Sequence, residues 1–447
     1  MKIIAHKVTL IVLLIIAGCS SMERTTVTPS AETKITEFYS ENYVRYHDRV
    51  YQDNIRSVKL HKVGFTLSMP IIELNSPDKL FLSFDDLDGD VKSYRYEIIH
   101  CDANWNPSDL FISEYTDGFD NGLIEDYAFS FNTMEGFTHY TLRFPKAGEV
   151  TPTLSGNYIL AVYESGKRDQ PVLTRRFMIY ESKVSIHAIV NQASDPQKQF
   201  THHEIDFNIQ PGNYYIEDPS RHLIIKVMQN QRWDTQVKNL KPKNIMPDKL
   251  DYNYEGKIVF RGLNEFRFFD TRSLRHQTPG VDRIYHDSLG NHVELEKDQI
   301  NPYGSYVSVE DINGRSYIIS YDVNREKELE ADYAWIHFTL PYPAPLTDGS
   351  IYIMGELSDW QFQDKARMQY DARAKAYRAS LYLKQGYYNY QYVFLANGAD
   401  RGDASRFEGQ HYETENDYTI FVYHRAAGAD YDKLIAVEKI NSGITEK

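Results

Sequence analysis

Residues 80–98 read LFLSFDDLDGDVKSYRYEI, and this stretch decides the fold class. Apolar residues alternate with smaller or polar ones from Leu80 to Phe84 and again from Tyr94 to Ile98. Alternation with a period of two is typical of half-buried β-strands. The residues Asp88-Gly89-Asp90 between the two segments favour a turn. The stretch therefore predicts two short strands joined by a turn.

Strand patterns of this kind continue along the chain of 447 residues. They recur at 140–144, 158–162, 175–179, 205–209, 223–227, 351–354, 377–383, 388–395 and 418–423. After the N-terminal leader, no helical period extends beyond about two or three turns. Many short strands separated by turns are typical of antiparallel sandwiches. We expect an all-β protein built from tandem antiparallel β-sandwich domains.

Shifts in pattern along the chain set the expected domain ranges, and the length fits about two to four domains. We expect a signal peptide over 1–18, a lipid-anchored tether and lead-in over 19–57, a first β-sandwich domain over 58–181, a second β-rich domain over 182–331, a third β-sandwich domain over 332–425 and a C-terminal tail over 426–447.

The N-terminus has the pattern of a lipoprotein signal peptide. Lys2 and Lys7 precede an apolar run at 10–16, which is shorter than the roughly 20 residues that span a bilayer. Ile16-Ala17-Gly18-Cys19 then matches a lipobox. We predict that Cys19 is acylated and anchors the chain in a membrane, since more than one acyl chain gives stable anchoring. Ser20, which is not aspartate, favours the outer membrane. The alternative is an ordinary signal peptide with a coincidental cysteine.

The net charge argues against one class of function, and the cysteine content argues against an internal disulfide. The net charge of −14 argues against nucleic-acid binding, which needs a basic surface. The chain has two cysteines, so with Cys19 acylated Cys101 has no partner for an internal disulfide. We expect Cys101 to be a buried small apolar residue.

No motif selects a catalytic, cofactor or metal site. The run Asp85–Asp90 would place Phe84 and Arg95 at positions where an EF-hand needs acids, so it favours a turn, with an irregular calcium site as the alternative. His202-His203-Glu204 lacks the second histidine of a helical zinc motif. His100-Cys101-Asp102 offers one local pair rather than a closed site. We expect a protein that is not an enzyme and has no cofactor.

The third domain resembles the early-set β-sandwich of glycogen- and starch-binding modules. The resemblance rests on residues 351–360 (IYIMGELSDW) and 382–394 (YLKQGYYNYQYVF). In binding members a sugar stacks on two tryptophans, and Trp360 matches the first of them. The second would follow Asn397-Gly398, where this chain has no tryptophan. The alternative function is therefore a glycan-binding outer-membrane lipoprotein of a polysaccharide-utilisation system, with Trp360 as a contact.

A denser resemblance covers the first domain. It rests on 83–90 (SFDDLDGD), 94–105 (YRYEIIHCDANW), 114–119 (EYTDGF), 130–133 (SFNT), 138–140 (THY), 155–158 (SGNY) and 174–177 (TRRF). Together these segments look like the plug protein family of the type IX secretion system of Bacteroidota. The resemblance implies a non-enzymatic protein that closes the periplasmic end of a large outer-membrane translocon barrel when no substrate carrier is bound. It implies that barrel as a partner and a location at the periplasmic face of the outer membrane.

Overall fold

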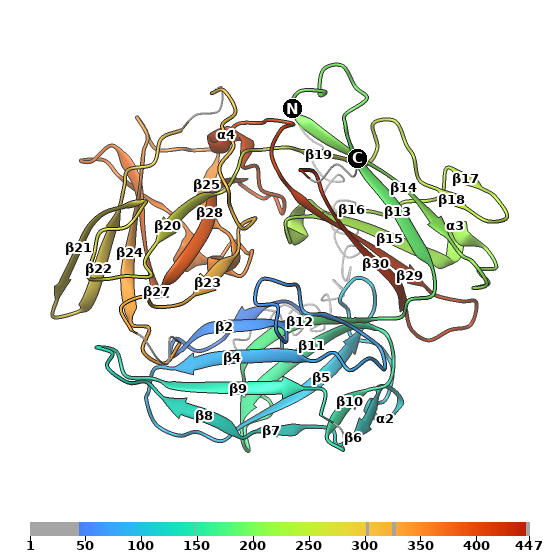
Figure 1. The fold of residues 1–447 in the computed structure, drawn as a ribbon, viewed down its shortest axis with the longest axis horizontal. Coiled ribbons are helices and arrows are strands. Elements are labelled where there is room, and N and C mark those ends of the chain that lie inside the picture. Colours follow the sequence, from blue (N-terminus) through green and yellow to red (C-terminus); the bar gives the residue numbers. More distant parts are fainter. Residues whose placement is uncertain (1–43, 147, 301–303, 324–327, 444–447) are drawn as a thin grey trace, which may run out of the picture. The chain divides into compact units, whose positions relative to one another are not determined.

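The computed structural model describes residues 44–146, 148–300, 304–323 and 328–443, and Cys19 lies outside them. Strands in seven sheets make up nearly all of the regular secondary structure in this part of the chain, so the predicted all-β fold class is confirmed. The sheets form three β bodies, which Figure 1 shows with their elements labelled. In the described ranges, no helix is both long and apolar enough to cross a membrane.

The first body is a sandwich of a six-stranded and a four-stranded sheet with a small two-stranded one beside them. Its elements are β1 (Arg49–Val50), β2 (Ile55–Lys62), β3 (Ile71–Glu73), β4 (Leu80–Asp86), β5 (Tyr94–Cys101), α2 (Ile112–Tyr115), β6 (Thr116–Gly118), β7 (Gly122–Ile124), β8 (Asp126–Phe129), β9 (Thr138–Phe144), β10 (Val150–Pro152), β11 (Gly156–Glu164) and β12 (Pro171–Tyr180). Alternate residues of both sheets meet in one aromatic core, in which Phe84 stacks on Tyr140 and Tyr158 on Phe177. The alternation at 80–98 predicted this burial correctly.

The second body packs a five-stranded sheet against a four-stranded one. Its elements are β13 (Ser185–Gln192), β14 (His202–Gln210), α3 (Pro219–His222), β15 (Leu223–Gln229), η1 (Trp233–Thr235), β16 (Val237–Lys238), β17 (Asn244–Ile245), β18 (Leu250–Asp251), β19 (Val259–Arg261), β29 (Asp417–His424) and β30 (Lys433–Asn441). Its core joins residues of β14 and β15 to residues of β29 and β30.

The third body is a second sandwich, of a five-stranded and a four-stranded sheet. Its elements are β20 (Arg267–Asp270), β21 (Val281–Asp287), β22 (Gly290–Leu295), β23 (Ser316–Ile318), β24 (Tyr333–Pro341), β25 (Gly349–Met354), η2 (Glu356–Ser358), η3 (Asp364–Ala366), β26 (Gln369–Asp371), β27 (Ala376–Lys384), β28 (Gly386–Ala396) and α4 (Ser405–Glu408). The long strand β28 pairs with β20, β23 and β25 and so organises one sheet.

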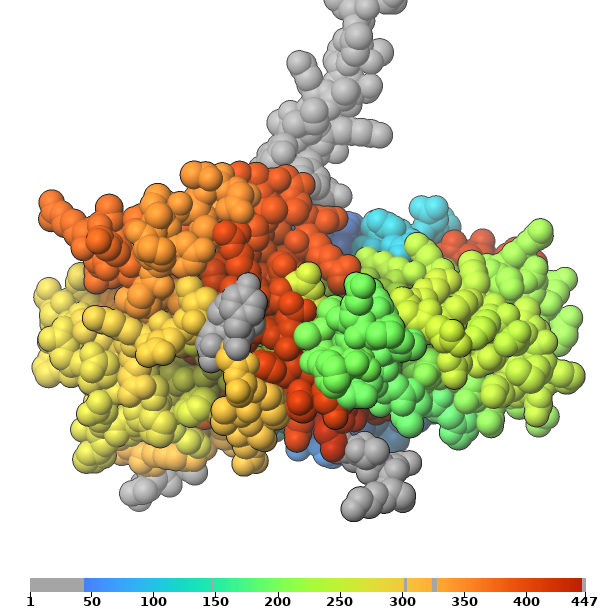
Figure 2. All heavy atoms as spheres, turned by 90° about the horizontal axis from the view of Figure 1, so that it is seen from above, coloured from blue at the N-terminus to red at the C-terminus, as the bar shows by residue number. Residues whose placement is uncertain are grey.

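The sheets group the chain differently from the expected ranges 182–331, 332–425 and 426–447. Strands β20 to β23 belong to the sheets of the third body, although they precede residue 331. Strands β29 and β30 return to the second body, where β29 pairs with β15 over seven residues. In Figure 2 the returning chain is orange-red. It lies between the green part of the surface and the yellow-to-orange part. Alternation predicts that a segment is a strand, but it does not name the strand's partner, so the return was not foreseen.

Candidate functional site

The junction between the first and third bodies is built around the carboxylate of Asp85. Asp85 lies near the end of β4, directly opposite His139 of β9. His139 Nδ1 lies 2.5 Å from Asp85 Oδ1. Two groups of the third body donate to Asp85 Oδ2, the hydroxyl of Tyr333 at 2.7 Å and the ammonium of Lys384 at 2.6 Å. Asp85 is therefore fully engaged by partners from both bodies.

Opposing effects set the ionisation of Asp85. Burial by itself would raise its pKa, but the charge of Lys384 and the contacts with His139 outweigh burial and hold the pKa below its ordinary value. The ammonium of Lys384 also lies 4.0 Å from the ring centre of Phe137. The junction thus stabilises an ionised carboxylate and its cation through protein groups of both bodies.

Two further ion pairs link the same two bodies. Lys59 of β2 lies 2.9 Å from Glu356 and donates to the hydroxyl of Ser316. Arg175 of β12 lies 3.1 Å from Asp359. Charged side chains of the first body thus match charged side chains of the third along the junction, which fixes their register.

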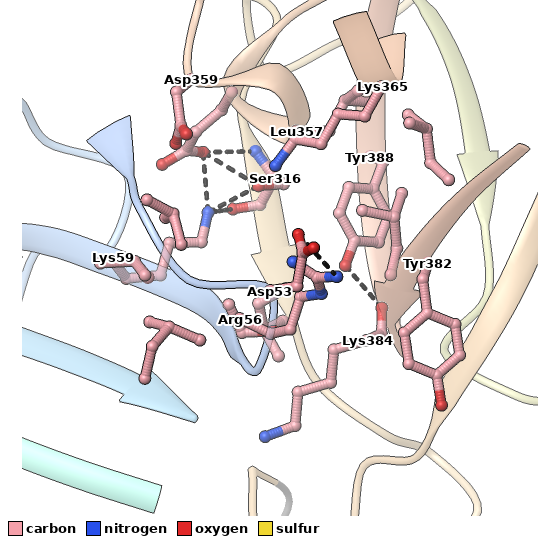
Figure 3. Close-up of a pocket in the computed structure, with 18 of the residues that line it drawn as sticks. Asp53, Arg56, Lys59, Ser316, Leu357, Asp359, Lys365, Tyr382, Lys384 and Tyr388 are labelled. Atoms are coloured by element: carbon pink, nitrogen blue, oxygen red, sulfur yellow. Dashed lines mark hydrogen bonds and ion pairs between the residues drawn. The ribbon is translucent and has the colours of Figure 1, made fainter. Parts of the chain in front are cut away.

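A cavity of about 210 Å³ lies within this junction. Figure 3 shows Arg56 and Lys59 on one side and Tyr382, Lys384 and Tyr388 on the other. The ammonium of Lys384 is paired with Asp85, and the ammonium of Lys59 is paired with Glu356. The volume falls below the roughly 300 Å³ at which small-molecule sites begin. We therefore regard this cavity as a consequence of packing two bodies through long polar side chains.

The junction between the first and second bodies is mainly apolar. The indoles of Trp105 and Trp233 meet edge to face at 5.4 Å, and the guanidinium of Arg176 lies over both rings, at 4.4 and 4.7 Å. The hydroxyl of Tyr423 donates to Asn157 Oδ1 at 2.8 Å. Together the two junctions attach the first body to both others, so the described chain forms a continuous folded block.

One part of the first body exposes large apolar side chains. Residues 109–129, which include α2, β6, β7 and β8, run together along one margin of the body in Figure 1. We call this region the aromatic margin, defined by the exposed side chains of Phe111, Phe119, Leu123, Tyr127 and Phe129. It is a candidate contact surface, because exposed apolar groups that gather on one region mark interaction sites.

Comparison with known proteins identifies the family. Residues 55–181, which make up the first body, match the family model described as the type 9 secretion system plug protein 1st domain. A crystal structure of a hypothetical protein from Parabacteroides merdae ATCC 43184 is 34% identical and superposes with a TM-score of 0.86. The match covers 89% of this chain and 100% of that one. The chain belongs to the type IX secretion system plug protein family. No curated protein matches it.

Membership in the plug family supports a role linked to type IX secretion, association with a secretion channel and an envelope-associated location. It confirms the resemblance seen at residues 83–177. The family model ends at residue 181, so the other two bodies of this plug protein are known here through their own geometry and through the Parabacteroides structure.

Trp360 is buried, with 7% of its surface exposed, and packs edge to face against Phe266 at 6.1 Å. Its cluster also contains Leu263, Met354 and Val393. In this conformation the indole faces are covered by apolar side chains, whereas sugar stacking needs an open face. A glycan contact at Trp360 stays an untested prediction.

The other candidate residues from the sequence are buried or make contacts within their own neighbourhood. Asp86 accepts a hydrogen bond from Tyr94 and pairs with Lys92 at 2.8 Å. His203 contacts the hydroxyl of Tyr418 at 2.6 Å. Cys101 is a buried free thiol whose pKa burial raises to about 12, so it is a poor nucleophile. Across the described residues, no group of three or more His, Cys, Asp or Glu side chains is placed to hold a metal.

Sequence reasoning missed Lys384, Tyr333 and His139. Asp85 was singled out as a turn residue, and its partners lie more than fifty positions away in the chain. The sequence carried no signal for Lys384, because it follows the alternation of 377–383 on the polar phase and its burial is known only from the structure. A buried lysine requires a partner, and the structure supplies it in Asp85.

Proposed function

We propose that this protein closes the periplasmic end of the outer-membrane translocon channel of the type IX secretion system when no substrate carrier is bound. The observation that carries the proposal is the match of the whole first body to the plug family model. The role needs no catalysis, since a folded block placed in the pore is sufficient. The channel, a large barrel protein of the outer membrane, is the proposed partner.

The construction of the block suits this task. Ion pairs at Asp85, Glu356 and Asp359 connect the first body to the third. The Trp105–Trp233 contact connects it to the second. A plug must resist displacement as one piece, and junctions made of buried pairs and aromatic packing resist bending at the boundaries.

The proposal includes a lipid on Cys19 that holds the protein at the periplasmic face of the outer membrane. A tethered plug has a high effective concentration at the pore, so modest affinity suffices and release during secretion stays fast. Metabolic labelling with a radioactive fatty acid tests this part. We expect label in the native chain and none in Cys19→Ala; equal labelling of both would overturn the lipidation proposal.

Channel conductance tests the central claim. The translocon barrel, purified from cells that lack this protein, is placed in a planar bilayer, and the purified plug protein is added to the periplasmic side. We expect the large open conductance to fall as the plug protein is added. An unchanged conductance, together with no recovery of the barrel when the plug protein is pulled down from native membranes, would refute the function.

A further inference from the structure

The aromatic margin is the part of the described surface where exposed phenylalanines gather. Phe111, Phe119 and Phe129 are 78%, 65% and 54% exposed, and all lie within twenty residues of chain. In the other two bodies, the exposed large apolar residues are separated, such as Tyr215 and Leu289, or form groups without phenylalanine, namely Ile245 with Met246 and Val307, Val309, Tyr317 and Tyr321. Single exposed apolar side chains need no explanation, whereas a group of them marks a contact surface.

The backbone of the margin is also available for contact. Strand β7 is the last strand of the six-stranded sheet, and β8 is the last strand of the four-stranded sheet. Among the described residues, neither has a strand paired on its outer side. Edge strands with exposed aromatic side chains tend to associate with other chains unless they are protected. On β8, Tyr127 and Phe129 meet edge to face at 6.0 Å and remain exposed.

The charge of the margin indicates what kind of surface it meets. From residue 96 to residue 142 the chain has no Lys or Arg. The exposed acids of the margin are Asp109, Glu114, Asp117, Asp120, Glu125 and Asp126. Cations from outside this segment reach two of them: Arg168 lies 3.0 Å from Asp120, and Lys146 lies 3.8 Å from Glu125. The margin is therefore aromatic and acidic, and it complements a basic surface.

We propose that the aromatic margin is the surface through which this protein binds the channel, and that the channel meets it with an apolar recess bordered by Lys and Arg side chains. The inference rests on the proposed function and adds the contact surface and the chemistry of the partner. A few residues supply most of the binding energy at protein interfaces and aromatic side chains are enriched among them, whereas surrounding charges set the rate and orientation of encounter.

Site-specific photocrosslinking in intact cells tests the surface directly. The photoreactive amino acid p-benzoylphenylalanine replaces Phe119 or Phe129, which changes an exposed aromatic residue into another. Matched controls carry it at Tyr215 or Leu289, exposed positions of the second and third bodies. We expect crosslinks to the very large barrel protein from positions 119 and 129 and none from 215 and 289.

Each result decides the proposal. Crosslinks to the barrel from the control positions alone would overturn the assigned surface while leaving the plug function intact. Crosslinks from 119 and 129 to some other protein would overturn the partner. No crosslink from 119 or 129, while the wild-type protein still lowers the channel conductance, would also reject the margin. Loss of the conductance effect in the wild type would instead count against the proposed function itself.

Binding measurements separate the aromatic from the acidic contribution. We expect Phe119→Ser with Phe129→Ser to raise the Kd for the purified barrel at least about tenfold. We expect Asp117→Asn with Asp126→Asn to slow association and to reduce its dependence on salt. Both pairs are exposed, so an unchanged melting temperature should accompany either effect. A Kd equal to that of wild type in the double serine variant would contradict the proposal.

Discussion

Lys384 Nζ lies 2.6 Å from Asp85 Oδ2, although 299 positions separate the two residues in the chain. Both side chains are almost completely buried, at 1% and 0% exposure. A charge buried without its partner is very unfavourable, so the first and third bodies can dock only in the orientation that joins this pair. The pair therefore acts on the orientation of the bodies as well as on stability.

Removing one member of this pair should weaken the fold strongly. We expect Lys384→Met to lower the free energy of unfolding by about 3–5 kcal/mol, because it leaves the carboxylate of Asp85 buried without its cation. The double variant Asp85→Asn with Lys384→Met should recover part of that loss. Urea unfolding followed by tryptophan fluorescence measures both effects.

A surface pair provides the control. Lys198 and Asp195 lie 3.3 Å apart, and their side chains are 45% and 37% exposed. Lys198→Met should change the free energy of unfolding by less than about 1 kcal/mol. If Lys384→Met lowers the free energy of unfolding by no more than Lys198→Met does, the pair with Asp85 does not hold the junction.

The sequence predicted strands well and their partners poorly. Alternation at 80–84, 94–98 and 140–144 located strands β4, β5 and β9, because the buried face of a sandwich strand imposes a period of two. The return of β29 to β15 depends on pairing between segments about two hundred residues apart, for which no local pattern exists. The same limit applies to the site, since Asp85 was visible as an acid but its cation was not.

The exposure of the aromatic margin could not be predicted from the sequence. Tyr127 and Phe129 alternate like buried strand residues. Strand β8 lies at the edge of its sheet, so these side chains remain exposed, and edge position is a property of topology.

Stability should decrease between mildly acidic and mildly basic pH because of Glu265. Burial raises the pKa of Glu265 from 4.5 to about 7. A carboxyl whose pKa is higher in the folded state stabilises that state below its unfolded pKa, and this contribution is lost as pH rises through about 7. Burial likewise raises the pKa of Asp311, to about 6, which adds to the same slope.

Glu265→Gln should reduce this slope. The hydroxyl of Tyr306 and the backbone N–H of Glu415 both donate to Glu265 Oε1, and the amide oxygen of glutamine can accept both. We expect the variant to gain about 1–2 kcal/mol over wild type at pH 8, less than the full pKa change implies because the residue is only half-buried. Urea midpoints at pH 5 and pH 8 measure this. Glu296→Gln, at an exposed position, should keep the wild-type dependence of stability on pH. If wild type and both variants show the same dependence, Glu265 is not its source.

The packing around Trp360 should make Gly314 intolerant of a side chain. A Cβ at Gly314 would lie 2.2 Å from the indole of Trp360 and 2.6 Å from the ring of Phe266. Gly256 has nearly the same φ, +76° against +78°, and open space around it. Both alanine variants carry the cost of a positive φ, so their difference isolates the clash. We expect Gly314→Ala to be less stable than Gly256→Ala by about 1–3 kcal/mol in urea unfolding. Equal stabilities would show that Trp360 and Phe266 move aside for a Cβ at little cost.

Trp233 should control how firmly the second body is held to the first. Its indole packs against Trp105 and the guanidinium of Arg176, and burial lowers the pKa of Arg176 to about 10. Trp233→Ala removes one of the two rings beside this cation. The backbone N–H of Glu181 donates to the carbonyl of Leu434 across the same junction, so its hydrogen exchange reports local opening. We expect exchange at Glu181 to become roughly tenfold faster or more.

A matched control removes an indole elsewhere. Trp335 packs against Tyr382 within the third body, at a ring distance of 4.9 Å. Trp335→Ala also deletes an aromatic contact, but it leaves the Trp105–Trp233 pair intact. Exchange at Glu181 should therefore stay at the wild-type rate in Trp335→Ala. If both variants accelerate it equally, the Trp233 contact does not act locally, and loss of global stability explains the change. If neither does, the junction is held by its hydrogen bonds, such as Tyr423 to Asn157, and the paired indoles are dispensable.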